Sequence, residues 1–297
     1  MSEQGDQAPI SGNGNGNGHA GGGHAVLLLH GLCGSAAEMG TIPKALEKRG
    51  FSVASLEIPG YSASAITLGV TPDWEDWCDS VDAEIARLKH THRTVSLCGL
   101  SMGATLALAV AARRNDILSL AVLSPLLRYD GWAMSWYVPL LKIPFLLGFR
   151  NWSYKERAPF GLRNAEMRRR VARAIEKGGV TEVGAAAIPA RQLYAANKLM
   201  RYVRSALSGI ESNILIIHSV DDETSAPRNA EVILHEVSSE IRKAVWLGDC
   251  YHIITFDNER EIVTNETARF IAKAAQAHED DIGHRRSGAR APLRDRR

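Results

Sequence analysis

Short apolar, β-branched runs alternate along much of the chain with longer stretches whose composition or spacing is typical of helices. The runs typical of buried strands are Ala25–Leu29, Phe51–Ile58, Thr94–Cys98, Ser119–Leu123, Asn213–His218 and Lys243–Leu247. Helices are predicted over Ala36–Arg49, from a capping Thr71 and first-turn Pro72 to Lys89, over Met102–Arg114 and over Asn258–Ala277. Near-continuous apolar strands alternating with helices predict a mostly parallel sheet of about six strands, with helices on both faces.

The alternation stops between Pro125 and Gly209, where no strand is predicted. This segment starts with the apolar stretch WAMSWYVPLLKIPFLLGF and continues with a basic helix, capped by Asn164 and running to Lys177. A second helix, from Pro189 to Gly209, carries apolar residues at helical spacing: Leu193, Ala196, Met200, Val203 and Leu207. We therefore expect residues 125–209 to form a helical cap on a core made of residues 24–124 and 210–277.

Both ends of the chain have compositions typical of disorder. Residues 1–23 include the repeat GNGNGNG and have little to bury, which predicts a flexible leader. Residues 278–297 form a basic tail, with six arginines from His284 onward. The formal net charge is only +2, so no nucleic-acid partner is expected.

The remaining composition is that of an ordinary globular protein. The N-terminus lacks the pattern of a signal peptide, so we expect a cytoplasmic protein whose four cysteines are reduced. The cysteine spacings suit no metal site, and the sequence indicates neither a metal nor a cofactor. No apolar run reaches the roughly 20 residues needed to span a bilayer. The stretch from Tyr137 to Phe149 could contact a membrane surface, but lining a cap is the favoured interpretation.

The candidate chemistry centres on Gly99-Leu100-Ser101-Met102-Gly103, between a predicted strand and a predicted helix. Glycines two residues before and after the serine allow strand and helix to approach closely at a sharp turn. This context favours Ser101 as an exposed nucleophile over a simple helix-capping serine.

Three other predicted strands also end in loops with polar groups. His30-Gly31-Leu32 follows the first strand, Ser219–Glu223 follows the fifth, and Gly248–His252 follows the sixth. In a parallel sheet these carboxyl ends meet at one edge. The order serine, acid, histidine is the one required when each residue follows a successive strand.

With these motifs the chain resembles the α/β-hydrolase superfamily, in the carboxylesterase and monoacylglycerol lipase-like branch of serine aminopeptidase type. The matching pieces are LLLHGLCGS, GLSMG, LIIHSVDDETSAP and GDCYHIITFD, within residues 24–276. The resemblance implies an α/β-hydrolase fold. It also implies that His30 shapes the oxyanion loop. Many relatives begin with an extra hairpin that is absent here, so a reduced sheet is expected.

The roles of the individual residues follow from the chemistry of their side chains and are hypotheses. Ser101 would attack the acyl carbon, His252 would transfer the proton, and the backbone N–H groups of Leu32 and Met102 would form the oxyanion hole. The acid is one of three adjacent residues, and counting back from Pro227 favours Asp222. Asp221 is the alternative, and Glu223 ranks third. Asp130 is a minor candidate, because some relatives carry the acid one strand earlier.

The leading hypothesis is a cofactor-independent serine hydrolase acting on small-molecule carboxylic esters with medium or long acyl chains. Trp136 and Phe145 of the apolar cap are the candidate acyl-binding residues. A thioesterase or acyltransferase would share the mechanism, and a non-catalytic binding protein is the alternative of another class. A serine at the turn argues against epoxide hydrolases and dehalogenases, which use aspartate there. The sequence does not determine the oligomeric state.

Overall fold

The computed structural model describes residues 23–66, 70–134, 140, 142–155, 157–176 and 187–288. Within these ranges six parallel strands form the main sheet, in the order β2-β1-β3-β4-β7-β8. The strands are β1 (Gly23–Leu29), β2 (Ser52–Ser55), β3 (His92–Leu100), β4 (Ser119–Leu123), β7 (Asn213–Ser219) and β8 (Arg242–Leu247). The predicted α/β-hydrolase fold is confirmed.

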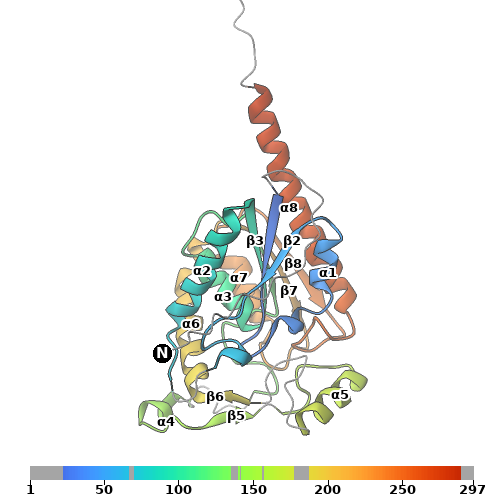
Figure 1. Cartoon of the computed structure of the whole chain (residues 1–297). Helices are drawn as coiled ribbons and strands as arrows, with labels where there is room; N and C mark the ends of the chain where they lie inside the picture. The colour runs from blue at the N-terminus through green and yellow to red at the C-terminus, as the bar shows by residue number, and fades with distance from the viewer. Residues whose placement is uncertain are drawn as a thin grey trace, which may run out of the picture.

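Helices cover both faces of this sheet (Figure 1). One face carries α2 (Trp74–Lys89), α3 (Met102–Ala111), α6 (Ala190–Ala206) and α7 (Arg228–Glu236), and the other carries α1 (Ile42–Glu47) and α8 (Arg260–Gly288). Alternate residues of β1 therefore enter two separate cores, Leu27 on the α3 side and Leu28 on the α8 side. Burial of both faces explains why the strands read as continuous apolar runs.

Residues 125–209, inserted between β4 and β7, are called the cap. Of its described parts, all but α6 lie at the end of the molecule where the strands terminate (Figure 1). It contains α4 (Lys142–Leu146), α5 (Ala165–Glu176) and two short antiparallel strands, β5 (Ser153–Lys155) and β6 (Ala187–Pro189). The prediction of no strand here was wrong, because strands of three residues are too short to show an alternating pattern. The predicted cap of α5 is confirmed: the Asn164 side chain accepts the N–H groups of Glu166 and Met167.

The second predicted cap helix, α6, packs against the core over most of its length. Its apolar residues, among them Ala196, Met200 and Val203, join the cluster formed by α2 and α3. Leu193, near the start of α6, instead lines the cavity described below. Most of the predicted stripe is thus confirmed as packing surface, and it joins the cap to α2 and α3.

Several predicted boundaries need correction. The helix expected over residues 36–49 is split into a short 3-10 turn (Ala36–Met39) and α1, because Gly40 adopts φ 57° between them. Helix α2 is preceded by Asp73 and not capped by Thr71, whose hydroxyl accepts a hydrogen bond from Arg191 of α6.

The last helix is longer than expected. Residues 278–288, assigned above to a disordered tail, continue α8, which projects beyond the sheet on the side away from the cap (Figure 1). Across the described ranges, no helix combines the length and the apolar character needed to cross a bilayer.

The turn that joins β3 to α3 brings backbone into contact with backbone. A Cβ on Gly99 would lie 2.3 Å from the carbonyl oxygen of Gly103, and a Cβ on Gly103 would lie 2.2 Å from that of Leu29. Neither backbone oxygen can move without shifting a strand or a helix. The two glycines of the predicted turn are therefore required by packing.

We expect Gly103→Ala to lower the free energy of unfolding by about 1–3 kcal/mol, because the new methyl group must push α3 away from β1. Urea denaturation followed by circular dichroism measures the change. Gly283→Ala is the matched control, since a Cβ there meets nothing within 4 Å and lies in the exposed part of α8. Equal stability of the two variants would contradict the packing argument.

Candidate active site

Ser101 occupies the turn between β3 and α3 at the carboxyl edge of the sheet. Its backbone has φ 56° and ψ −119°, a conformation that residues with a side chain rarely adopt. The Ser101 N–H donates to the carbonyl oxygen of Leu123 at 2.8 Å, which joins the turn to β4. The side chain is partly exposed and faces a cavity.

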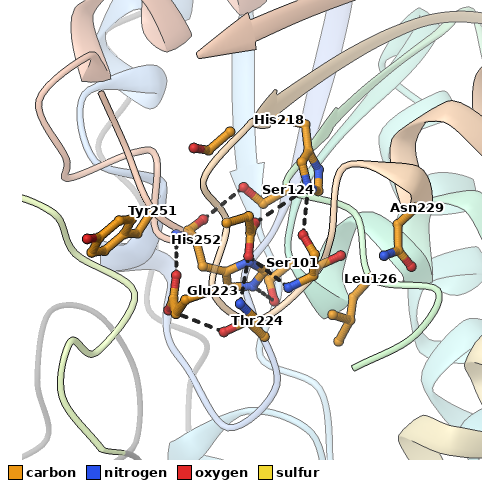
Figure 2. Close-up of polar contacts among 12 residues, drawn as sticks. Ser101, Ser124, Leu126, His218, Glu223, Thr224, Asn229, Tyr251 and His252 are labelled. Carbon is orange, nitrogen blue, oxygen red and sulfur yellow. Dashed lines mark hydrogen bonds and ion pairs between the residues drawn. The ribbon is translucent and has the colours of Figure 1, made fainter. Parts of the chain in front are cut away.

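His252, on the loop after β8, is hydrogen-bonded to both Ser101 and Asp222. Figure 2 shows His252 beside Ser101. Its Nδ1 lies 2.7 Å from Asp222 Oδ2, and its Nε2 lies 2.8 Å from Ser101 Oγ. Because a carboxylate can only accept, Nδ1 carries the proton and Nε2 accepts from the serine hydroxyl. The structure therefore brings the three sequence-predicted residues into one continuous chain of hydrogen bonds.

Asp222 is completely enclosed by hydrogen-bond donors. Its Oδ1 accepts the N–H groups of Thr224 and Ser225 at 2.9 and 2.8 Å. Burial by itself would raise the pKa of this carboxyl group, but His252, His218 and the Ser225 N–H outweigh it and hold the pKa of Asp222 below its ordinary value. Asp222 is therefore ionised at neutral pH.

The other three candidate acids point elsewhere. Asp221 is exposed and pairs with Arg163 at 2.6 Å. Glu223 is buried, and its Oε2 accepts the backbone N–H of His252 at 3.0 Å. Burial, with the neighbouring Asp222 adding to it, raises the pKa of Glu223 above its ordinary value. Asp130 accepts the N–H of Ala226 at 2.8 Å and binds side chains at the start of α7.

His218, at the end of β7, supports the acid loop and was not singled out from the sequence. Its Nε2 donates to the carbonyl oxygen of Ser225 at 2.8 Å and lies 3.6 Å from Asp222 Oδ2. Burial lowers the pKa of His218 despite the nearby carboxylate, which keeps the ring neutral. A polar residue at the end of an apolar strand was the only signal in the sequence.

The loop after β1 is held in shape by two buried side chains. The His30 ring is bonded to the Gly31 carbonyl oxygen at 2.7 Å and to Ser62 Oγ at 2.9 Å, as expected for a residue that shapes this loop. The Glu38 carboxylate accepts the Gly31 N–H at 2.7 Å. Glu38 went unnoticed in the sequence, because it stands in a stretch predicted as ordinary helix. Together these contacts hold the backbone of Gly31, the residue before Leu32.

A cavity of about 560 Å³ opens beside Ser101 and His252 and extends into the cap. Its apolar lining includes Leu32, Met102, Leu126, Phe145, Ile188, Leu193 and Tyr194. Phe145 is buried and stacks on Tyr194 of α6, with ring centroids 4.2 Å apart. The other candidate acyl-binding residue, Trp136, lies outside the described residues.

All four cysteines are buried, and none forms a disulfide. Burial raises the pKa of Cys98 and of Cys250 to about 12, so neither thiol is ionised at neutral pH. Among the residues that the structure describes, no three His, Cys, Asp or Glu side chains are grouped so that they could hold a metal ion.

The sequence is similar to those of a known lipase and a known esterase. The chain is 25% identical over 270 residues to a thermostable monoacylglycerol lipase of Bacillus sp. (strain H-257), covering 91% of this chain and 99% of that protein. It is also 25% identical over 260 residues to a carboxylesterase of Bacillus subtilis (strain 168), covering 85% of this chain and 94% of the relative.

The fold matches a solved structure over nearly its full length. The crystal structure of Paleococcus ferrophilus monoacylglycerol lipase superposes with a TM-score of 0.69 at 20% identity, covering 87% of this chain and 97% of that one. The family model described as serine aminopeptidase, S33 (Hydrolase_4) matches residues 23–259. The chain therefore belongs to this serine aminopeptidase S33 family and is an esterase- and lipase-like α/β-hydrolase.

Proposed function

We propose that the protein hydrolyses carboxylic esters of medium or long acyl chains through an acyl-serine intermediate. The observation that carries this proposal is the chain of hydrogen bonds from Asp222 through His252 to Ser101, placed beside a cavity with a largely apolar lining. The similarity to proteins named monoacylglycerol lipase and carboxylesterase supports the same reaction class.

In this mechanism Ser101 Oγ attacks the acyl carbon while its proton passes to His252 Nε2. The imidazolium then gives that proton to the leaving alcohol, and a water molecule activated by the same nitrogen releases the acid. Asp222 keeps the proton on Nδ1 and stabilises the imidazolium. The low pKa of Asp222 suits this role, because only the ionised carboxylate can do both.

The negative charge on the acyl oxygen needs two hydrogen-bond donors close to Ser101. Met102 is the first residue of α3, where N–H groups have no partner within the helix. Leu32 belongs to the loop fixed by His30 and Glu38, and it lines the same cavity. We assign the oxyanion hole to the N–H groups of these two residues.

The cavity supports the preference for longer acyl chains. Its volume of about 560 Å³ lies within the range of small-molecule sites, and its apolar side chains come largely from the cap. Phe145, locked against Tyr194, presents a rigid apolar wall to an acyl chain.

Replacing Ser101 with Ala should reduce ester hydrolysis on the order of a million-fold, as for other serine hydrolases, without unfolding the protein. A fluorophosphonate probe should label the wild-type protein and the Ser205→Ala control, in which an exposed hydroxyl is lost, but not the Ser101 variant. Undiminished hydrolysis by the pure Ser101→Ala protein would exclude this serine as the nucleophile. A wild-type protein that neither reacts with the probe nor hydrolyses esters would indicate the binding-protein alternative.

Asp222→Asn should lower turnover by about ten-thousandfold, because the amide can place a donor against His252 Nδ1. Asp221→Asn provides a matched control one residue away and should change turnover by less than about threefold, since Asp221 pairs with Arg163 at the surface. Steady-state kinetics with one p-nitrophenyl ester measures both. The reverse ranking would assign the acid to Asp221.

Phe145→Ala should lower the ratio of long-chain to short-chain ester turnover by about tenfold, because a large apolar wall is lost from the cavity. A panel of p-nitrophenyl esters of increasing acyl length, run beside the matching acyl thioesters, measures chain preference and separates an esterase from a thioesterase. Phe149→Ala is the control, since that ring is 68% exposed in the same segment. Equal losses at every chain length would show that Phe145 only supports the cap.

A further inference from the structure

Three consecutive backbone N–H groups around His252 each donate to a different residue. The Tyr251 N–H donates to Asp257 Oδ2 at 2.7 Å, and the His252 N–H donates to Glu223 Oε2 at 3.0 Å. The Ile253 N–H donates to the carbonyl oxygen of Gly161 at 2.8 Å. Figure 2 shows the Glu223 side chain reaching the His252 backbone from one side and Ser124 from the other. These contacts therefore hold the backbone from which the imidazole projects.

Two of the three contacts involve the cap. Gly161 belongs to the cap segment that leads into α5, and its carbonyl oxygen binds the residue after His252 directly. Asp257 is fully buried, and besides Tyr251 its carboxylate accepts the N–H groups of Arg163 and Asn164 at 2.7 and 2.8 Å. One carboxylate thus binds the cap segment and the histidine loop together.

The lack of space around Gly161 shows how closely the cap segment approaches the histidine loop. Gly161 has φ 73°, and a Cβ there would lie 2.4 Å from Ile253 Cγ1. Outside this contact, Arg163 of the cap pairs with Asp221 and Asp249, which follow β7 and β8. The cap segment cannot shift toward the histidine loop without displacing it.

We propose that the cap segment 161–164, acting through Asp257 and the Gly161 carbonyl, is a positioning element that keeps His252 aligned with Ser101. The inference rests on the proposed function, since it assumes that His252 transfers the proton. In this arrangement a displaced cap lengthens the bond between Ser101 and His252, so ester cleavage depends on the seating of the cap. Asp257 is a positioning residue, because it acts through the backbone of the loop and does not reach the cavity lining.

A misplaced His252 harms some substrates more than others. An alkyl alcohol must receive a proton from the imidazolium as it leaves, whereas p-nitrophenolate leaves without one. Ethyl and p-nitrophenyl esters of the same acid therefore report the alignment of His252 through the ratio of their kcat/KM values. A merely structural defect lowers both values equally and leaves the ratio unchanged.

The test compares Gly161→Ala and Asp257→Asn with a matched control for each. Gly148→Ala places the same methyl group at another cap glycine with positive φ, where nothing lies within 4 Å. Asp79→Asn makes the same isosteric change on α2, at a carboxylate that is 62% exposed and pairs with Arg113. Circular dichroism and the melting temperature establish that each variant is folded.

For the Gly161 and Asp257 variants we expect kcat/KM to fall about a hundredfold on the ethyl ester and about tenfold on the p-nitrophenyl ester, since a misplacement of about 1 Å can cost a hundredfold in rate. Both controls should retain the wild-type ratio. If Asp257→Asn does not fold, Gly161→Ala decides the question by itself.

An unchanged ratio in the folded Gly161→Ala variant overturns the proposal, and so does an equal change of ratio in Gly148→Ala. A wild-type protein that hydrolyses neither ester refutes the proposed function, and this inference with it. An active wild-type protein whose ratio is insensitive to Gly161→Ala refutes this inference alone.

Discussion

The close approach of α3 to the ends of β1 and β3 is the constraint on which the rest of the site depends. Gly99 and Gly103 leave no room for a Cβ, so the helix begins directly over the strand ends and Ser101 is forced into a positive-φ turn. The same approach brings Met102 beside the loop that carries Leu32, and both line the cavity. One packing contact thus brings Ser101, Met102 and Leu32 to the same cavity.

Buried carboxylates hold the loops of this site in shape. Glu38 binds a backbone N–H in the loop after β1, and Asp222 binds two in the loop after β7. Glu223 and Asp257 bind the loop that carries His252. Burying a charge is costly unless it is satisfied by donors, and backbone N–H groups in irregular loops need acceptors. Each buried carboxylate therefore gives acceptors to backbone N–H groups, and those N–H groups stabilise its charge. At Glu223 burial outweighs this stabilisation, and the pKa of the carboxyl group is raised.

The cap belongs to the site both as a wall and as a support. Helix α6 joins it to the core through α2 and α3, while Phe145 and Tyr194 line the cavity above Ser101. The segment that enters α5 is bonded to the histidine loop through Asp257. In the proposed mechanism, substrate binding and alignment of His252 therefore share one structural element.

Much of the fold was determined by the sequence alone. The apolar runs predicted all six strands of the main sheet. The pattern is clearest in the inner strands, which are buried on both faces. The order of serine, acid and histidine after successive strands predicted that Ser101 and His252 lie close together, since the carboxyl ends of parallel strands meet at one edge of the sheet. Counting back from Pro227 indicated Asp222, the acid that the structure places against His252.

Other features depended on contacts between segments far apart in the chain. The break at Gly40, the short strands β5 and β6 and the helical turns beyond Ala277 have no local pattern strong enough to predict them. Glu38, His218 and Asp257 read as ordinary helix, strand or loop residues, because each gains its role from a backbone group that only folding brings near. Local periodicity reports which face of an element is buried. Only the tertiary structure decides which distant N–H a buried carboxylate meets.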